Sequence, residues 1–173
     1  MVADKKLEGD FVLKTTQFTH AERVYICAPL SLKTREKIFN TVCVASEYAK
    51  YIKTRMQYFA VSVHSYLPAF LNDKILTQRE QMRALRMQIL GQCDIVMVCG
   101  ERVDRGMKQD ILCALKQNKR IVVFTPEVFK IVMKLVQISG VTAFDLRYDE
   151  QHMRLAKAPK VQSYNSFLKL CCS

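Results

Sequence analysis

The sequence predicts an α/β fold: a three-layer sandwich around a mostly parallel, doubly wound sheet of the flavodoxin-like or Rossmann-like kind. Two observations predict it. Short apolar runs rich in β-branched and aromatic residues alternate along the chain with longer segments that have helical periodicity. The short runs are apolar at successive positions, as in parallel strands that helices cover on both faces. Right-handed crossovers between such strands then place helices on both sides of the sheet.

Four apolar runs are expected to be the strands of this sheet. The first, "RVYICAPL", is rich in β-branched and aromatic residues and is ended by Pro29. The four predicted strands span residues 23–28, 58–63, 94–99 and 120–124. A fifth candidate strand is "AFDLRY" (143–148), in a stretch whose pattern is harder to interpret.

Four helices are expected between and after the strands. The first, over 33–54, is indicated by an apolar stripe at steps of four and three residues: Ile38, Val42, Ala45, Ala49 and Ile52. The other three are expected over 77–91, over 105–117, and from Pro126 to a stop at Gly140.

The length of 173 residues suits one folded domain with a sizeable core. We expect a polar N-terminal arm over 1–21, an α/β domain over 22–140, and a C-terminal extension over 141–173 packed on or near that domain. No apolar run is long enough to span a membrane, and the first residues lack the apolar segment of a secretion signal. A cytoplasmic protein without a membrane partner is therefore expected.

The seven cysteines are interpreted as free thiols in a reducing compartment, because their number is odd and most lie in apolar runs. We expect five of them to be buried: Cys27, Cys43, Cys93, Cys99 and Cys113. With no C-x-x-C pair and only three histidines, a zinc site is not expected, and no metal or cofactor is predicted.

The formal net charge of +11 favours phosphate-bearing partners, either nucleic acid or a nucleotide. Lysine and arginine are dispersed, with no block of five or more, so nucleic acid is the less favoured partner. The loop after the first strand has no glycine, which disfavours dinucleotide binding through G-x-G-x-x-G. Ser31 in this loop could donate to a phosphate or a sugar, or simply cap the next helix.

Ligands of doubly wound sheets bind outside the carboxyl ends of the strands. The loop after the second strand holds four polar or aromatic candidates for a nucleobase slot: His64, Tyr66, Asn72 and Asp73. His64 could equally be a structural imidazole.

The stretch "GERVDRGMKQD" (100–110) follows the third strand and starts at Gly100. Asp104 is placed to cap the next helix, and Gly106 would let a ligand approach the backbone. Asp110 lies about 60° around the helix from Met107, at the border of the buried face. Capping does not explain an acid there, so a catalytic or binding role is the alternative.

Four segments in this order resemble the nucleoside 2-deoxyribosyltransferase-like superfamily, and most closely its small uncharacterised bacterial and phage branch. They are "VYICAPL", "VHSYLPAFLND", "LGQCDIVMVCG" and "DRGMKQD", and the resemblance covers about residues 22–124. It implies enzymes that cleave the N-glycosidic bond of a nucleoside or nucleotide. A carboxylate attacks the sugar C1′, and the sugar then passes to a second base or to water.

The resemblance also assigns roles to residues. Asp110 occupies the nucleophile position, Asp104 matches the polar group that holds the sugar or orients the nucleophile, and Tyr25 matches a tyrosine close to the nucleophile. Gly100, Gly106 and Met107 would line the substrate site. A homodimer or larger homo-oligomer is implied.

Two departures from the family pattern bear on activity. Asp110 is one methylene shorter than the usual glutamate, and a misplacement of about 1 Å can cost roughly a hundredfold in rate. Arg86 stands where many active members carry an acid that contacts the base, so a candidate proton donor is lost; an arginine there could bind a phosphate or other acidic group instead.

Three functions therefore remain open. The first is nucleoside or nucleotide N-glycosidic chemistry, as a 2-deoxyribosyltransferase or an N-glycoside hydrolase. The second is non-catalytic binding of a nucleotide or a nucleotide-derived signal on the same fold. The third, motivated by the charge alone, is binding of nucleic acid.

Overall fold

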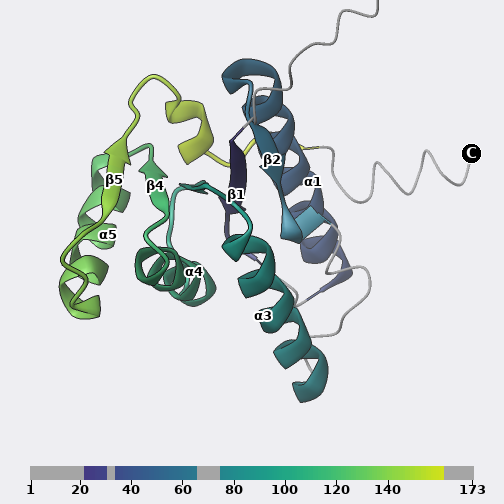
Figure 1. Ribbon diagram of the computed structural model, residues 1–173. Helices are drawn as coiled ribbons and strands as arrows, with labels where there is room; N and C mark the ends of the chain where they lie inside the picture. The colour runs from purple at the N-terminus through teal and green to yellow at the C-terminus, as the bar shows by residue number, and fades with distance from the viewer. Residues whose placement is uncertain (1–21, 31–33, 66–74, 162–173) are drawn as a thin grey trace, which may run out of the picture.

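The computed structural model describes residues 22–30, 34–65 and 75–161. A five-stranded sheet forms the middle layer, in the order β2-β1-β3-β4-β5, and all neighbouring strands are parallel (Figure 1). The strands are β1 (Arg23–Cys27), β2 (Phe59–Val61), β3 (Ile95–Val98), β4 (Arg120–Val123) and β5 (Asp145–Tyr148). The predicted class, a doubly wound α/β sandwich, is confirmed.

The central strands are buried on both faces, and the edge strands are not. All four residues of β3 are buried, as are the last four of β1, whereas β2 and β5 contain no buried residue. Tyr25 pairs with Val61 on one side and with Val96 on the other. This burial explains why β1 and β3 have near-continuous apolar sequences.

Four α-helices and three short helical turns surround the sheet in the described residues. The α-helices are α1 (Arg35–Tyr51), α3 (Leu76–Gly91), α4 (Arg105–Lys116) and α5 (Pro126–Ser139). The turns are the π-helical η1 (Ile52–Met56) and the 3-10 turns η2 (Val63–Ser65) and η3 (Met153–Ala156). Thr34 and Thr125 cap α1 and α5 by accepting from backbone N–H groups three residues on, at 3.2 and 3.3 Å.

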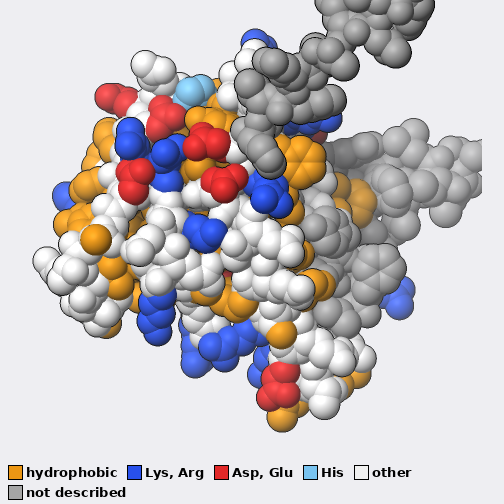
Figure 2. Space-filling view, viewed as in Figure 1, with side chains coloured by type: hydrophobic (Ala, Val, Ile, Leu, Met, Phe, Trp, Pro, Cys, Tyr) orange, Lys and Arg blue, Asp and Glu red, His pale blue; other side chains and the backbone are white. Residues whose placement is uncertain are grey.

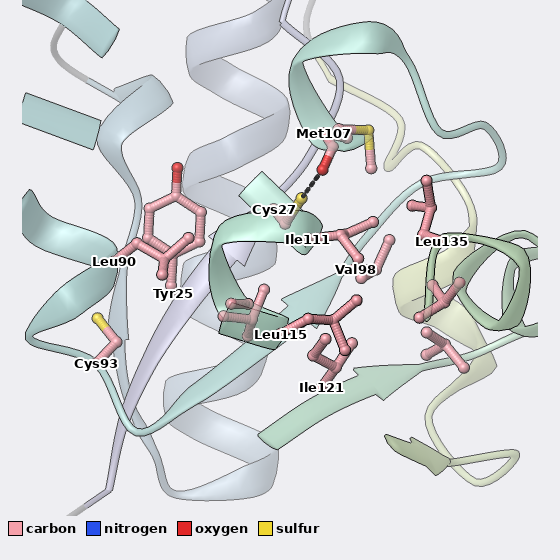
Figure 3. Close-up of a cluster of buried hydrophobic side chains, with 14 of the residues drawn as sticks. Tyr25, Cys27, Leu90, Cys93, Val98, Met107, Ile111, Leu115, Ile121 and Leu135 are labelled. Atoms are coloured by element: carbon pink, nitrogen blue, oxygen red, sulfur yellow. Dashed lines mark hydrogen bonds between the residues drawn. The ribbon is translucent and has the colours of Figure 1, made fainter. Parts of the chain in front are cut away.

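Two apolar clusters hold the helices against the two faces of the sheet. One lies under α3, α4 and α5, and Figure 3 shows part of it. In this cluster the Cys27 thiol donates to the Met107 carbonyl oxygen, 3.8 Å from Sγ. The other lies under α1, η1 and η3, and it contains Ile26, Met97 and Leu155. The turn η3 therefore shares with α1 the covering of the second face.

The inward face of α1 differs from the predicted stripe. The residues of α1 that are buried are Thr41, Ala45 and Tyr48, whereas Ile38, Val42 and Ala49 are only half-buried. A polar threonine and an amphipathic tyrosine take inward positions; the Tyr48 hydroxyl donates to the Lys157 carbonyl at 3.1 Å. Hydropathy alone does not reveal such an inward polar face.

The sheet continues past residue 140, where the sequence analysis ended the α/β domain. Strand β5 pairs with β4 in parallel register, Ile121 opposite Leu146, and η3 is part of the second core cluster. Residues 141–156 are therefore integral to the domain, and β5 lies within the predicted fifth strand, 143–148.

Burial of the cysteines is confirmed for three of five. Cys27, Cys93 and Cys99 are buried as free thiols, and burial raises the pKa of each. Cys43 and Cys113 are half-buried, which corrects the expectation for these two. No helix within the described ranges is both long and apolar enough to cross a membrane.

Candidate functional site

The strand order places a crevice between β1 and β3. The chain moves outward from β1 to β2 in one direction and from β3 to β5 in the other, so the order reverses at the boundary of β1 and β3. Ligands of doubly wound sheets bind outside the carboxyl ends of the strands at such a switch point. The segments that leave β1 and β3 there are residues 28–30 and 99–104.

A hollow of about 790 Å³ opens at this point, between α1 and the loop that joins β3 to α4. Its walls are mostly apolar, with a few polar groups, and its volume is typical of small-molecule sites. The lining residues are Pro29, Leu30, Lys37, Asn40, Thr41, Val44, Tyr48, Gly100, Glu101, Arg102, Val103, Asp104 and Ala158.

Gly100 allows the two sides of the hollow to approach closely. It adopts φ +96°, a left-handed conformation that side chains other than glycine rarely take. A Cβ at this position would lie 3.1 Å from Pro29 Cδ. The backbone N–H of Gly100 donates to the Leu155 carbonyl at 2.8 Å, which fixes η3 beside the hollow.

Asp104 acts as the predicted helix cap and also ties α4 to the segment after β1. Its Oδ1 accepts from the Met107 backbone N–H at 2.8 Å, and its Oδ2 accepts from the Leu30 N–H at 3.3 Å. Both oxygens therefore have structural partners, although Asp104 lines the hollow. Capping accounts for this carboxylate.

Asp110 lies in a closed cluster on the other side of α4. It is 0% exposed, and Arg86 Nη2 lies 2.6 Å from each of its carboxylate oxygens. The Tyr25 hydroxyl donates to Oδ2 at 3.0 Å. The three side chains come from α4, α3 and β1, and we call them the buried cluster. In Figure 3 the Tyr25 ring lies beside Leu90, with its hydroxyl pointing out of the apolar cluster.

Gly106 lies against the guanidinium of Arg86. Arg86 Nη2 also donates to the Gly106 carbonyl at 3.3 Å, and a Cβ on Gly106 would lie 3.5 Å from this nitrogen and 3.3 Å from Asp104 Oδ1. A side chain at 106 would therefore contact both Asp104 and Arg86, and approach of a ligand to this backbone stays a prediction.

The buried cluster has shifted proton affinities. Burial raises the pKa of Asp110, and the adjacent Arg86 opposes that rise. Burial, and then the Asp110 charge, raise the pKa of Tyr25 well above its usual value. Burial works to lower the pKa of Arg86, but the Asp110 carboxylate outweighs it and raises that pKa. The Asp110 carboxylate therefore keeps Arg86 protonated, whereas Tyr25 stays neutral mainly because it is buried.

His64, in η2, is also buried, at 2% exposed. Within the described part of the chain, neither ring nitrogen has a hydrogen-bond partner, nor do Ser62 Oγ and Arg86 Nε. Burial, and then the charge of Arg86, lower the pKa of His64 to about 3, so the ring is neutral at pH 7. Unpaired buried polar atoms are uncommon in folded proteins.

The structure separates the predicted site residues into two groups. Tyr25, Arg86 and Asp110 meet in the buried cluster, with Gly106 against it, whereas Gly100 and Asp104 line the hollow. Met107 is 1% exposed and packs in the core, so it does not line the hollow as predicted. Ser31, Tyr66, Asn72 and Asp73 lie outside the described residues.

Sequence reasoning missed the wall that α1 contributes. Lys37, Thr41, Val44 and Tyr48 follow each other at steps of three and four, so they share one helix face toward the hollow. This spacing was a usable signal, but it mixes polar and apolar residues. Ser62 was missed as well, and the sequence carries no signal for it.

The described residues contain no cluster of three or more His, Cys, Asp or Glu side chains that could hold a metal ion.

Comparison with known proteins places the chain in a family. No curated protein matches it. A family model matches residues 22–124, which run from before β1 to just after β4 and include the buried cluster and most of the lining of the hollow. The protein belongs to the family described as a domain of unknown function, DUF7768.

Proposed function

We propose that this protein binds a nucleoside- or nucleotide-type ligand in the hollow between β1 and β3, without catalysis by Asp110. One observation carries the proposal. The carboxylate expected to be the nucleophile is fully buried and paired through both oxygens with Arg86, and it does not line the hollow.

The ion pair explains why Asp110 is a poor nucleophile. An attacking carboxylate needs a lone pair directed at the sugar carbon and space for the sugar beside it. Here Arg86 lies against both oxygens, and Asp110 does not line the hollow. Removing one partner of a buried ion pair costs about 3–5 kcal/mol of stability. Moving Arg86 away from Asp110 would therefore carry a free-energy cost of that order.

The hollow has the chemistry of a small-molecule site. Pro29, Val44 and Val103 supply apolar surface, as a nucleobase would require, and Asn40 offers an amide that can donate and accept. The cationic side chains of Lys37 and Arg102 also line it and could meet a phosphate. The resemblance to nucleoside-processing proteins selects nucleosides and nucleotides from the small molecules that would fit.

A thermal-shift panel of nucleosides and nucleotides tests the proposal. At a hundred times Kd, a ligand should add about 2.7 kcal/mol to the free energy of unfolding. Val44→Phe, which fills the hollow, should abolish this gain. Val42→Phe is the matched control, because Val42 is on the same helix and does not line the hollow. If no compound stabilises the protein, or if both variants behave alike, the proposal is wrong.

N-glycosidic chemistry is the second candidate, and one contact favours it. The Tyr25 hydroxyl bonds to Asp110, the arrangement that the resemblance implies for an active site. Arg86 would have to leave the carboxylate before any attack. Chromatography for free base after incubation with deoxynucleosides and deoxynucleotides tests this: we expect no release from the wild type. Release that Asp110→Ala abolishes would establish the enzyme.

Nucleic-acid binding has less support. On the face shown in Figure 2, Lys and Arg side chains lie in separate places, several of them next to Asp and Glu, rather than in one stripe. Binding to duplex or single strands that weakens steeply with salt would favour it. The cytoplasmic location and the homo-oligomer stay predictions from the sequence and the resemblance.

A further inference from the structure

A second, smaller hollow shares one wall residue, Tyr48, with the first hollow between β1 and β3. It lies where α1 and η1 meet η3, and its volume is about 220 Å³. Three cationic side chains line it against one carboxylate: Lys50, Arg55 and Arg154 against Glu47. We call this space the basic hollow, because its lining carries a surplus of positive charge.

The positive charges of the basic hollow have little to balance them. Glu47 Oε1 lies 4.0 Å from Lys50 Nζ, and the two side chains are 47% and 72% exposed. Ion pairs as exposed as this one contribute little. Within the residues that the structure describes, neither Arg55 nor Arg154 pairs with a carboxylate, whereas Arg120 on β4 pairs with two. An anion from outside the chain would supply the missing partner.

Arg154 is oriented before any ligand binds. Its guanidinium carbon, Cζ, lies 5.6 Å from the centroid of the Tyr51 ring. A cation–π contact of this kind covers one face of the planar guanidinium and leaves the N–H groups at its edges available as donors. The Tyr51 ring also meets the His152 ring edge to face, with 6.2 Å between centroids, and His152 Nδ1 lies 2.7 Å from Asp149 Oδ2. This chain of contacts fixes the ring on which Arg154 rests.

The volume and the donors of the basic hollow favour a phosphate group as its ligand. Sites for drug-sized molecules measure about 300–1,000 Å³, so this space is too small for a whole nucleotide. A water molecule takes about 30 Å³ in the liquid, so the basic hollow has room for roughly seven atoms of that size, enough for a phosphate group. Guanidinium groups match phosphate oxygens in geometry, and a phosphate brings more charge and more acceptors than a carboxylate.

We therefore propose that the basic hollow is a phosphate-binding site, separate from the nucleotide-type site of the first hollow. Arg55 and Arg154 donate to the phosphate oxygens, and Lys50 adds a third positive charge. The site does not depend on the proposed function, because Tyr48 is the one residue that the two linings have in common.

Isothermal titration calorimetry of the full-length protein with inorganic phosphate, at constant ionic strength, tests the proposal. We expect saturable binding by the wild type. Arg154→Gln should weaken it roughly tenfold or more, because it removes charge-assisted hydrogen bonds. Lys53→Gln is the matched control: Lys53 is an exposed cation on η1 that does not line the basic hollow, so this variant should bind like the wild type. Val44→Phe, which fills the first hollow, should also bind like the wild type.

A second variant guards against loss of the fold. Arg154→Gln also removes the contact with Tyr51, whereas Lys50→Gln leaves it in place and should still weaken phosphate binding. Circular dichroism shows whether each variant is folded.

Three outcomes overturn the proposal. The first is the absence of saturable binding by the wild type. The second is equal weakening in Arg154→Gln and Lys53→Gln, which means that only the net charge attracts phosphate. The third is loss of binding in Val44→Phe alone, which places the phosphate in the first hollow and supports the nucleotide proposal instead. The first two outcomes leave the nucleotide proposal standing.

Discussion

The hollow and the buried cluster lie on opposite sides of the same switch point and have opposite character. The hollow, on the α1 side, is open and mostly apolar, with charged residues at Lys37, Glu101 and Arg102. The buried cluster, under α3 and α4, is closed and built around an ion pair. The three residues of the buried cluster thus do not line the hollow. A catalytic motif is informative only when a cavity accompanies it.

The largest expected effect comes from breaking the ion pair. Arg86→Leu should lower the free energy of unfolding by about 3–5 kcal/mol, because it leaves the buried Asp110 without its cation, with only the Tyr25 hydroxyl as a partner. Urea unfolding followed by circular dichroism measures this. Arg86→Leu combined with Asp110→Leu should recover much of the loss. A loss below about 1 kcal/mol in the single variant would mean that Asp110 reaches solvent or ligand. The buried cluster would then be accessible, like the hollow, and the contrast between the two regions would be wrong.

Acidification should reveal the buried imidazole. The pKa of His64 is about 3 in the folded protein against an ordinary value of 6.5, so below pH 6.5 only the unfolded state takes up the proton. Stability therefore falls as the pH falls through this window, by about 2 kcal/mol from His64 between pH 6.5 and pH 5. His64→Gln should remove this part of the pH dependence. An equal slope in both proteins would show that the ring titrates normally.

A smaller effect is expected at the residue that joins the two regions. Asp104→Ala should cost about 1 kcal/mol, the usual value of a lost helix cap, and Asp104→Asn should cost less, because an amide oxygen can still cap. Thermal unfolding measures both. A loss of several kcal/mol would indicate that the second bond, to the Leu30 N–H, also holds the hollow together.

The fold could be predicted because its signals are local. The continuous apolar runs of β1 and β3 identify buried parallel strands, and Pro126 and Gly140 bound α5 within one residue of the expected ends. Asp104 was identified as a cap because capping depends on neighbours in sequence. The end of β5 at Tyr148 was found for the same reason, although its start and its pairing with β4 were not.

The arrangement of the site could not be predicted, because it depends on contacts between distant segments. Helix geometry placed Asp110 at the border of the buried face, but the partner that closes it in, Arg86, lies on α3, 24 residues away. Arg86 was noted only as a departure from the family pattern. The α1 wall was missed because Tyr48 and Thr41 are polar residues at inward positions.

The double contact of Asp104 has a mechanical consequence. Its carboxylate accepts one hydrogen bond from the Met107 N–H in the first turn of α4 and another from the Leu30 N–H in the segment after β1. A movement of the segment after β1 away from α4 would therefore strain the hydrogen bonds of Asp104 at the start of α4. Asp110 lies in the next turn of this helix. A change at the hollow would in this way act on the helix that carries Asp110, although Asp110 itself does not line the hollow.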